Sequence, residues 1–399
     1  MQTLYYRTYQ NVMKQAMKLL PWREAEMLEG EGSLQDLPKK IEQSDVSRVL
    51  LVTDKGIVAA QLIDEFVEQV RDLNIHVTIF DETIPNPTID TIESAVKSYR
   101  DNNCDAVLAF GGGSVIDCAK LTAAKIVKPK KSVDQLKGLF KVMKALPPLF
   151  AVPTTAGTGA EATLAAVFSN AETYEKYPVM DTSLIPDVIV LDPLLTVKLP
   201  KNITAETGMD ALTHAVEAYI GNSRTKETIA WSKEATSLIF DHLYDAYKDG
   251  SNIRARTAMQ RAAFLAGKAF TRSYVGYVHA IAHQLGGFYN MPHGLANAIV
   301  LPHVLEYYGE AVYERLAELA DVIGITETND SYIQKAEKFI QAIKDLNKKL
   351  AIPNQLEVIE EEHVPIMIER ALREANPLYP VPKILKEDDL SQLFYLIKK

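Results

Sequence analysis

The residues best suited to chemistry lie in one short stretch of the second half of the chain. Residues 276–294, GYVHAIAHQLGGFYNMPHG, contain three of the eight histidines of the sequence. His279 and His283 are four residues apart, so on a helix they share one face and can converge on a common point. His293 follows in a Pro-His-Gly sequence, where we expect a turn. Imidazole binds metal ions and transfers protons near neutral pH, so this stretch is a candidate for either role.

A second pair with the same spacing, Asp210 and His214, lies in MDALTHAVEAY, which we predict to be a helix. Together with His279 and His293, the pair offers one carboxylate oxygen and three imidazole nitrogens. That set suits a borderline divalent ion such as Fe²⁺ or Zn²⁺, whereas Mg²⁺ and Ca²⁺ prefer oxygen ligands. His283 would then lie near the metal without necessarily binding it.

The alternative to a metal site is a structural role for these histidines. A single histidine on an apolar helix face is usually a hydrogen-bonded core residue. The paired spacing favours a metal over this alternative, but spacing alone leaves both open. Of the other histidines, we expect His303 in the core or beside the site, and we expect His76, His242 and His363 to be surface or packing residues.

The segment AVLAFGGGSVIDCAK, residues 106–120, runs from a predicted strand through three glycines into a predicted helix. Gly111, Gly112 and Gly113 would let the backbone approach a ligand closely. The helix start beside Ser114 offers free N–H groups and the positive end of its dipole to a phosphate. The spacing matches neither the Rossmann fingerprint nor a Walker A motif. A tight strand-to-helix turn without a ligand is the alternative.

Two further features lie at predicted strand ends. Thr154, Thr155 and Thr158, in VPTTAGTGAEAT, could contact a ribose, a phosphate or a nicotinamide amide, or could cap a helix. Asp54 closes LLVTD, where a carboxylate can accept from both hydroxyls of an adenosine ribose or cap the next helix. Several such loops favour a nucleotide, because ligands of open α/β sheets bind at the carboxyl ends of the strands.

The elements that must position these residues divide the chain near residue 200. Short β-branched runs alternate with helical patterns from Arg48 onward, which predicts a mostly parallel sheet with helices on both faces. Residues 1–47 resemble a capping segment that precedes the sheet. After Pro200 amphipathic helical patterns dominate. We therefore predict an α/β dinucleotide-binding domain over 1–200, an all-helical metal-binding domain over 201–399, and an active site in the cleft between them.

Composition narrows the class of protein. A net charge of −9 without a cluster of Lys and Arg excludes nucleic acid as the expected partner. No run of apolar residues is long enough for a transmembrane helix, so no membrane partner is expected, and the first residues lack the apolar core of a secretory signal. Cys104 and Cys118 are expected to be buried thiols in a reducing compartment. These features predict a cytoplasmic protein.

Seven segments taken together resemble one family. They are LLVTDKG, PNPT, GGGSVIDCAK, PTTAGTGAEAT, IPDVIVLDP, TGMDALTHAVEAYI and HAIAHQLGGFYNMPHGLANAIVLPHV, spread over about residues 35–310. In these segments the chain resembles the iron-containing (group III) alcohol dehydrogenases, whose fold is shared with glycerol dehydrogenase and dehydroquinate synthase. The resemblance implies a metal-dependent enzyme that transfers a hydride between NAD(H) and a small primary alcohol or aldehyde.

The resemblance also implies roles for individual residues. The metal ligands would be Asp210, His214, His279 and His293, holding Fe²⁺ or Zn²⁺. His283 matches the catalytic histidine between the metal and the nicotinamide, and would relay the proton of the alcohol to solvent. The implied cofactor-binding residues are Asp54, Asn86, Gly111, Gly112, Gly113, Ser114, Asp117, Thr154, Thr155, Thr158, Lys176 and Leu195. Asp at position 54 matches the family members that prefer NAD over NADP.

The resemblance is weakest at the two ends of the chain. The first forty or so residues do not resemble the usual short N-terminal lead, and the region beyond residue 310 is too variable to indicate a substrate. The family suggests a homodimer. The alternatives are a glycerol or diol dehydrogenase, a lyase of the dehydroquinate synthase type that needs a Glu/His/His zinc set, and a non-catalytic protein that retains the fold.

Overall fold

The computed structural model describes residues 2–171 and 175–399. The chain divides into two compact units. The α/β unit is Pro21–Lys198, and the helical unit combines Met1–Leu20 with Leu199–Lys399. The division at Lys198 lies close to the boundary expected near residue 200. The first twenty residues differ from the prediction, which places them in the α/β domain, because Met1–Leu20 belongs to the helical unit.

The α/β unit is built on a six-stranded sheet in which every neighbouring pair of strands is parallel. The strand order is β1 (Glu26–Glu29), β9 (Val188–Leu191), β6 (Leu149–Pro153), β4 (Ala106–Gly111), β2 (Arg48–Val52) and β3 (His76–Phe80). The expectation that the sheet begins near Arg48 was wrong, because β1 pairs with β9 at one edge. Strand β1 is short and mostly exposed, so it carries no apolar run that would reveal it.

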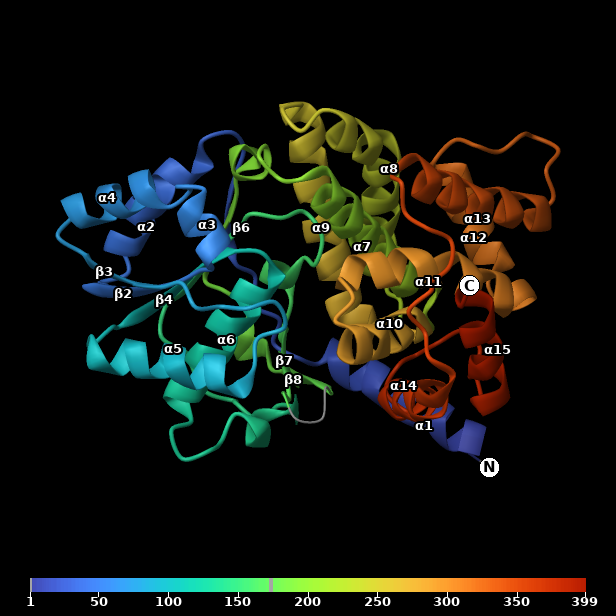
Figure 1. The fold of residues 1–399 in the computed structure, drawn as a ribbon, viewed down its shortest axis with the longest axis horizontal. Helices are drawn as coiled ribbons and strands as arrows, with labels where there is room; N and C mark the ends of the chain where they lie inside the picture. The colour runs from blue at the N-terminus through green and yellow to red at the C-terminus, as the bar shows by residue number, and fades with distance from the viewer. Residues whose placement is uncertain (1, 172–174) are drawn as a thin grey trace. The chain divides into compact units, whose positions relative to one another are not determined.

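Side chains alternate across this sheet and fill two separate cores. Leu50 and Val52 belong to one core with α5 (Ile89–Asp101) and α6 (Gly113–Val127). Val49 and Leu51, which point to the opposite face, belong to the other core with α2 (Leu37–Glu42) and α4 (Asp64–Asp72). The two helical layers are visible above and below the strands in Figure 1. Burial of both faces explains why the strands read as continuous apolar runs.

Strands β2 and β4 are neighbours whose connections leave in opposite directions. From β2 the chain passes through α3 (Lys55–Ala59) and α4 to β3 on one side. From β4 it passes through α6 to β6 on the other side. Such a reversal leaves a crevice at the carboxyl ends of the two strands, which is where open α/β sheets bind their ligands. Asp54 follows β2 and the three glycines follow β4, so the predicted nucleotide residues lie at this point.

A second, three-stranded sheet of the α/β unit was not predicted. It contains β5 (Gly138–Leu139), β8 (Lys176–Met180) and β7 (Ala165–Ser169), with β7 and β8 antiparallel. Short 3₁₀ turns connect the strands of this unit: η1 (Ser33–Asp36), η2 (Asp134–Leu136), η3 (Ala160–Ala162), η4 (Thr182–Leu184) and η5 (Pro193–Thr196).

The helical unit contains α-helices and 3₁₀ turns, and its described residues form no named strand. Helix α7 (Lys201–Ile220) is buried on nearly all sides from Gly208 onward, as expected for a helix in the centre of a bundle. It packs against α8, α9 and α11. The other α-helices are α1 (Gln2–Lys18), α8 (Lys226–Lys248), α9 (Ile253–Ser273), α10 (Tyr277–Tyr289), α11 (His293–Tyr308), α12 (Tyr313–Val322), α13 (Tyr332–Lys349), α14 (Val364–Ala375) and α15 (Glu387–Ile397), and the 3₁₀ turns are η6 (Gly309–Ala311) and η7 (Glu361–His363).

Helix α1 belongs to the helical unit because its polar side chains bind distant backbone carbonyls there. Arg7 donates to the carbonyls of Val381 and Pro382, and Lys14 donates to the carbonyl of Asn222. These bonds join residues more than 200 positions apart, so no local pattern of residues 1–47 could indicate them.

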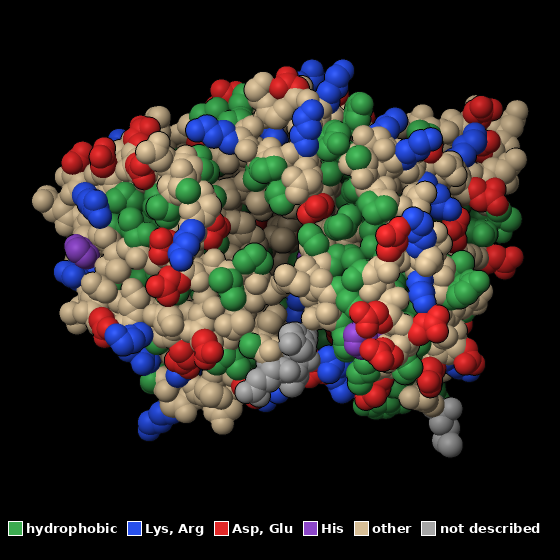
Figure 2. Space-filling model, viewed as in Figure 1, with side chains coloured by type: hydrophobic (Ala, Val, Ile, Leu, Met, Phe, Trp, Pro, Cys, Tyr) green, Lys and Arg blue, Asp and Glu red, His purple; other side chains and the backbone are tan. Residues whose placement is uncertain are grey.

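Figure 2 shows acidic and basic side chains interspersed over the visible face. Among the described residues, no helix combines the length and the apolar character that crossing a bilayer demands. Cys104 and Cys118 are both buried free thiols.

Candidate active site

Helix α7 supplies the first two residues of a buried polar cluster. Asp210 and His214 lie one turn apart on this helix and are 2% and 4% exposed. The ring of His214 stacks on Phe270, with 4.1 Å between the ring centroids. Gly294 allows the first turn of α11 to approach α7 closely. A Cβ at this position would lie 2.1 Å from the carbonyl oxygen of Glu206, so any other residue would push the helices apart.

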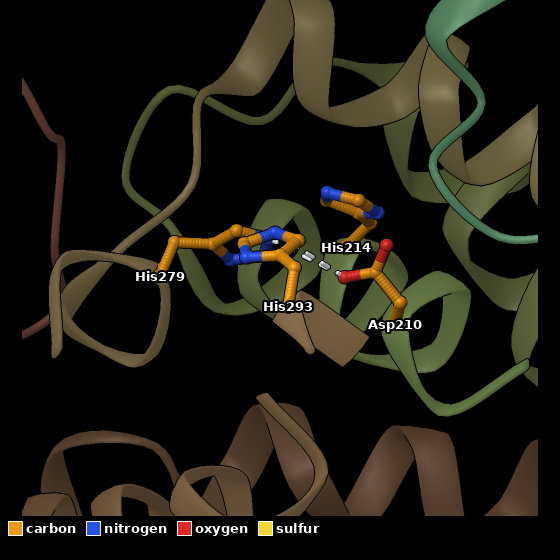
Figure 3. Close-up of side chains that lie close together, drawn as sticks. All are labelled: Asp210, His214, His279 and His293. Carbon is orange, nitrogen blue, oxygen red and sulfur yellow. Dashed lines mark ion pairs between the residues drawn. The ribbon is translucent and has the colours of Figure 1, made fainter. Parts of the chain in front are cut away.

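Helices α10 and α11 supply the other two members, His279 and His293. His293 is the first residue of α11 rather than part of a free turn. Each of the four side chains offers one ligand atom, and these atoms all lie within 4.8 Å of one another. The Nε2 atoms of His293 and His279 lie 3.6 Å and 4.0 Å from Oδ1 of Asp210. Figure 3 shows the four side chains gathered around this point. The structure therefore brings together all four residues predicted to bind a metal.

Glu217 sets the orientation of His279. Its carboxylate lies 2.6 Å from Nδ1 of His279 and accepts the backbone N–H groups of Gly276 and Val278, both at 2.9 Å. A carboxylate with two such donors accepts a third hydrogen, so Nδ1 carries the proton and Nε2 presents its lone pair to the cluster. Gly276 is required at this place, because a Cβ would lie 2.7 Å from Oε1 of Glu217.

Asn297 sets the orientation of Asp210. Its Nδ2 donates to Oδ1 of Asp210 at 2.7 Å and lies 3.2 Å and 3.1 Å from Nε2 of His279 and His293. One carboxylate oxygen and two imidazole nitrogens therefore face the same point. Buried acceptors that converge in this way fit a divalent cation, and the nitrogen-rich set fits Fe²⁺ or Zn²⁺ better than Mg²⁺ or Ca²⁺.

His283 lies beside this cluster but is not one of its four members. Its ring stacks on that of His293, with 5.1 Å between the ring centroids. Its Nδ1 lies 2.7 Å from Oε1 of Glu374 on α14. The side chain of His283 is 18% exposed and that of His293 is 26% exposed, so both are partly open to solvent. The proton-relay role of His283 stays a prediction.

The remaining histidines lie outside the cluster. His76 is exposed on β3 and His242 is half-buried on α8. His303 contacts the carbonyl of Asn354 through Nε2, and His363 contacts the hydroxyl of Tyr289 through Nδ1.

In the α/β unit, the glycine loop and the threonine loop are in direct contact. A Cβ on Gly113 would lie 2.6 Å from Cγ2 of Thr158, and a Cβ on Gly112 would lie 3.3 Å from Cγ2 of Thr155. The backbone N–H of Thr154 donates to the carbonyl of Gly111 at 3.0 Å. The glycines are therefore required by the close approach of the two loops, whatever ligand binds there.

Two further predicted cofactor residues lie near this pair of loops. Asn86 has a φ of 56°, in the left-handed region that asparagine tolerates, and its N–H donates to Oγ of Ser114 at 3.2 Å. Asp54 caps helix α3 by accepting the N–H of Ile57 at 3.0 Å. The helix-capping alternative for Asp54 is thus realised in the structure, at the carboxyl end of β2.

Asp117 and Lys120 lie three residues apart on α6, and of the two side chains Asp117 is half-buried and Lys120 fully buried. Burial raises the pKa of Asp117 to about 7, although the nearby charges of Lys120 and Lys176 oppose the shift. Burial lowers the pKa of Lys120 to about 8. The Lys120 ammonium donates to the carbonyls of Ala160 and Thr163, both at 2.6 Å, and so ties α6 to the segment that follows the threonine loop.

The last two predicted cofactor residues differ in their surroundings. Lys176 begins β8 and lies close enough to Asp117 for its charge to lower the pKa of that carboxyl group. Leu195, after β9, is 8% exposed and packs into the core that contains α2 and α4.

Three residues that contact the histidines were missed by the sequence analysis. Glu217 follows His214 by three residues and Asn297 follows His293 by four, so each shares a helix face with a predicted ligand. That spacing is the signal that could have revealed them. Glu374 had no local signal, because it lies 91 residues from His283.

Two protein-family models match the sequence of this chain. A model of iron-containing alcohol dehydrogenases matches residues 25–193, and a model of the C-terminal part of Fe-containing alcohol dehydrogenases matches residues 204–397. The chain belongs to the iron-containing alcohol dehydrogenase family. The family, the fold class and the assignment as an alcohol dehydrogenase, all predicted from the sequence, are confirmed. The four clustered side chains lie within the C-terminal match, and the glycine and threonine loops lie within the other.

Individual members of this family are similar over most of their length. The chain is 40% identical to a 1,3-propanediol dehydrogenase of Klebsiella pneumoniae over 87% of its own length and 90% of the relative. It is 33% identical to an NAD-dependent methanol dehydrogenase of Bacillus methanolicus, with 91% and 96% covered. The structure of an alcohol dehydrogenase from Oenococcus oeni superposes with a TM-score of 0.91 at 33% identity, over 94% of this chain and 99% of that one.

Proposed function

We propose that this alcohol dehydrogenase interconverts small primary alcohols and aldehydes with NAD(H) at a centre containing Fe²⁺ or Zn²⁺. The observation that carries the proposal is the buried convergence of four ligand atoms, from Asp210, His214, His279 and His293, within 4.8 Å of one another. A divalent cation held there supplies Lewis acidity to a substrate oxygen. The diol named in the Klebsiella relative makes 1,3-propanediol a substrate to test alongside simple alcohols.

The residues around the cluster would orient its side chains toward a bound metal ion. The Glu217 carboxylate holds Nδ1–H of His279, so the lone pair of Nε2 faces the cluster. The Asn297 amide holds Oδ1 of Asp210. Nε2 of His283 would pass the proton of the alcohol toward solvent, because the ring stacks on His293 and the side chain is partly exposed.

NAD is proposed to bind at the carboxyl ends of β2, β4 and β6. The N–H groups at the start of α6, from Gly111 to Ser114, would bind the pyrophosphate with Asp117 nearby. Contact between the glycine and threonine loops supports this assignment. The further assignments are the adenosine ribose to Asp54, the adenine side to Asn86, the nicotinamide end to Thr154, Thr155 and Thr158, and additional cofactor contacts to Lys176 and Leu195. Hydride transfer requires the nicotinamide C4 to lie next to the carbon atom of the substrate that gives or receives the hydride. We include this arrangement in the proposal.

A matched pair of histidine variants tests the centre. His214→Ala should lose both bound metal and alcohol-dependent NADH formation, whereas His76→Ala, at an exposed site, should keep both. Metal analysis of anaerobically purified protein, followed by a panel of alcohols with NAD and NADP, identifies the ion, the cofactor and the substrate. A His214→Ala variant that keeps its metal and its turnover would refute the ligand assignment.

We also propose a homodimer located in the cytoplasm. Strand β1 lies at an edge of the sheet, and its side chains are mostly exposed, so a strand of a second copy could pair with this edge. Two buried free thiols suit a reducing compartment. Light scattering of the purified protein and of a variant with Met27→Pro in β1 tests the dimer, and cell fractionation tests the location.

A further inference from the structure

We propose that Glu374 is a positioning residue for His283, and that the N-terminal helix α1 holds Glu374 in place through the segment that contains Tyr379. The inference rests on the proposed function, because it concerns the histidine assigned to proton transfer. It adds two helices, α14 and α1, to the part of the chain that supports the site.

The contact between Glu374 and His283 determines which ring nitrogen carries the proton. Oε1 of Glu374 lies 2.7 Å from Nδ1 of His283. An ionised carboxylate only accepts hydrogen bonds, so Nδ1 of His283 is the donor, and in the neutral ring the lone pair is then on Nε2. The parallel ring of His293, at 5.1 Å and 19°, restricts rotation of the imidazole. A ring without the carboxylate could exchange its tautomers and present Nε2–H instead.

Glu374 is held by two other donors. The hydroxyl of Tyr379 donates to Oε1 at 2.9 Å, and Nε2 of Gln284 donates to Oε2 at 3.4 Å. Burial, with the carboxylates of Glu374 and Glu217 nearby, raises the pKa of Tyr379 well above its ordinary value, so the hydroxyl keeps its proton and remains a donor. The carboxylate therefore has partners on both oxygens and a restricted orientation.

The segment that contains Tyr379 is fastened to helix α1. Nε2 of Gln10, a residue only 4% exposed, donates to the carbonyl of Tyr379 at 2.7 Å. The Arg7 guanidinium donates to the carbonyls of Val381 and Pro382 at 2.6 Å and 2.9 Å. Three of the four carbonyls from 379 to 382 thus bind side chains of α1. Helix α1 lies outside both ranges matched by the family models, 25–193 and 204–397.

The first experiment compares Glu374→Gln with Glu369→Gln in the full-length, Zn²⁺-loaded protein. Glu369 lies on the same helix, is largely exposed and pairs with Arg373 instead of His283. In Glu374→Gln we expect kcat to fall about 10-fold, with the alcohol KM changed less than about twofold and metal content unchanged. ¹⁵N NMR of the labelled imidazoles, with the His283 signals assigned by His283→Gln, should show a single Nδ1–H tautomer in the wild type and a mixture in the variant.

The control variant should match the wild type in both measurements. A Glu374→Gln protein with wild-type His283 signals and a kcat equal to that of Glu369→Gln would overturn the inference. The NMR measurement does not require turnover, so it tests Glu374 even if the wild type oxidises no alcohol. Absence of turnover or of bound metal in the wild type would instead count against the proposed function.

The second experiment tests the brace by comparing Arg7→Met with Lys18→Met, both on α1. Lys18 is exposed and donates to Gln15 of its own helix. Arg7→Met should shift the His283 signals in the same direction as Tyr379→Phe does and lower kcat by about threefold. This effect is smaller than that of Glu374→Gln, because Arg7 acts on His283 through the segment that contains Tyr379 and then through Glu374. Wild-type His283 signals in Arg7→Met, in protein that remains folded by circular dichroism, would remove α1 from the inference.

Discussion

The two candidate sites of this chain offer different chemical groups to a ligand: one offers side chains and the other mainly backbone. The cluster in the helical unit consists of side chains from three helices, and its four members span residues 210 to 293. The loops in the α/β unit offer mainly backbone, and the threonine loop lies so close that a Cβ on Gly113 would be 2.6 Å from Cγ2 of Thr158. We expect the first site to fail when a ligand atom is removed. We expect the second site to be impaired when an atom is added.

The largest effect that this comparison predicts comes from removing a cluster member. Asp210→Ala should lose metal and lower kcat/KM at least ~10³-fold, the equivalent of several kcal/mol of lost charge stabilisation. NADH binding, followed by fluorescence, should be unchanged because the proposed cofactor residues lie in the other unit. Asp241→Ala, at an exposed position of α8, is the control. A parallel loss of NADH affinity in Asp210→Ala would contradict the separation of the two sites.

Glu217→Gln tests a residue that contacts His279 of the cluster but is not one of the four proposed ligands. We expect metal affinity to fall about 10–100-fold, because a neutral amide holds Nδ1–H of His279 less strongly and no longer accepts three donors equally well. Competition with a chelator measures the affinity. Turnover at saturating metal should recover most of its wild-type value, and a variant that stays inactive when fully loaded would assign Glu217 a different role.

Gly113→Ala tests the opposite site by adding one carbon. The new Cβ would meet Cγ2 of Thr158 at 2.6 Å, so we expect a loss of about 1–3 kcal/mol in the free energy of unfolding and a higher KM for NAD. Metal content should remain at the wild-type level. The double variant Gly113→Ala/Thr158→Ala removes the colliding methyl group and should recover part of the stability. No recovery would show that the clash lies elsewhere.

The smallest expected effect concerns two buried glutamates, one in each unit, and the pH dependence of the free energy of unfolding. Glu217 accepts three donors, whereas burial raises the pKa of Glu161, in the α/β unit, to about 7 against the opposing charge of Lys120. The folded state therefore holds the Glu161 proton more tightly than the unfolded chain. This contribution to stability is complete below the unfolded pKa of 4.5 and is lost as the pH rises through about 7.

Glu161→Gln should consequently raise the free energy of unfolding at pH 8 by about 1–3 kcal/mol and leave it nearly unchanged at pH 4. Urea unfolding curves at the two pH values measure the difference. A variant less stable than the wild type at pH 8 would show that the ionised carboxylate is compensated in the folded protein.

The sequence predicted those parts of both sites that depend on local periodicity. Asp210 and His214 share a helix face because residues four apart always do, and the strand-glycine-helix pattern of residues 106–120 appears as β4 and α6. Helical spacing alone does not distinguish His279 from His283, although the prediction placed His279, and not His283, among the four candidate ligands. Both have the correct spacing, yet His279 joins the cluster and His283 pairs with Glu374.

What the sequence by itself determined is therefore local: the strands of both cores, the central helices and the residue types able to bind a metal. The tertiary structure alone decided which side chains meet. Close packing of α11 on α7 at Gly294, the attachment of β1 to β9, and the docking of α1 on residues 379–382 each join segments far apart in the chain. Backbone hydrogen bonding imposes the periods of helices and strands at short range, whereas such contacts depend on how whole elements pack, which no short window of residues encodes.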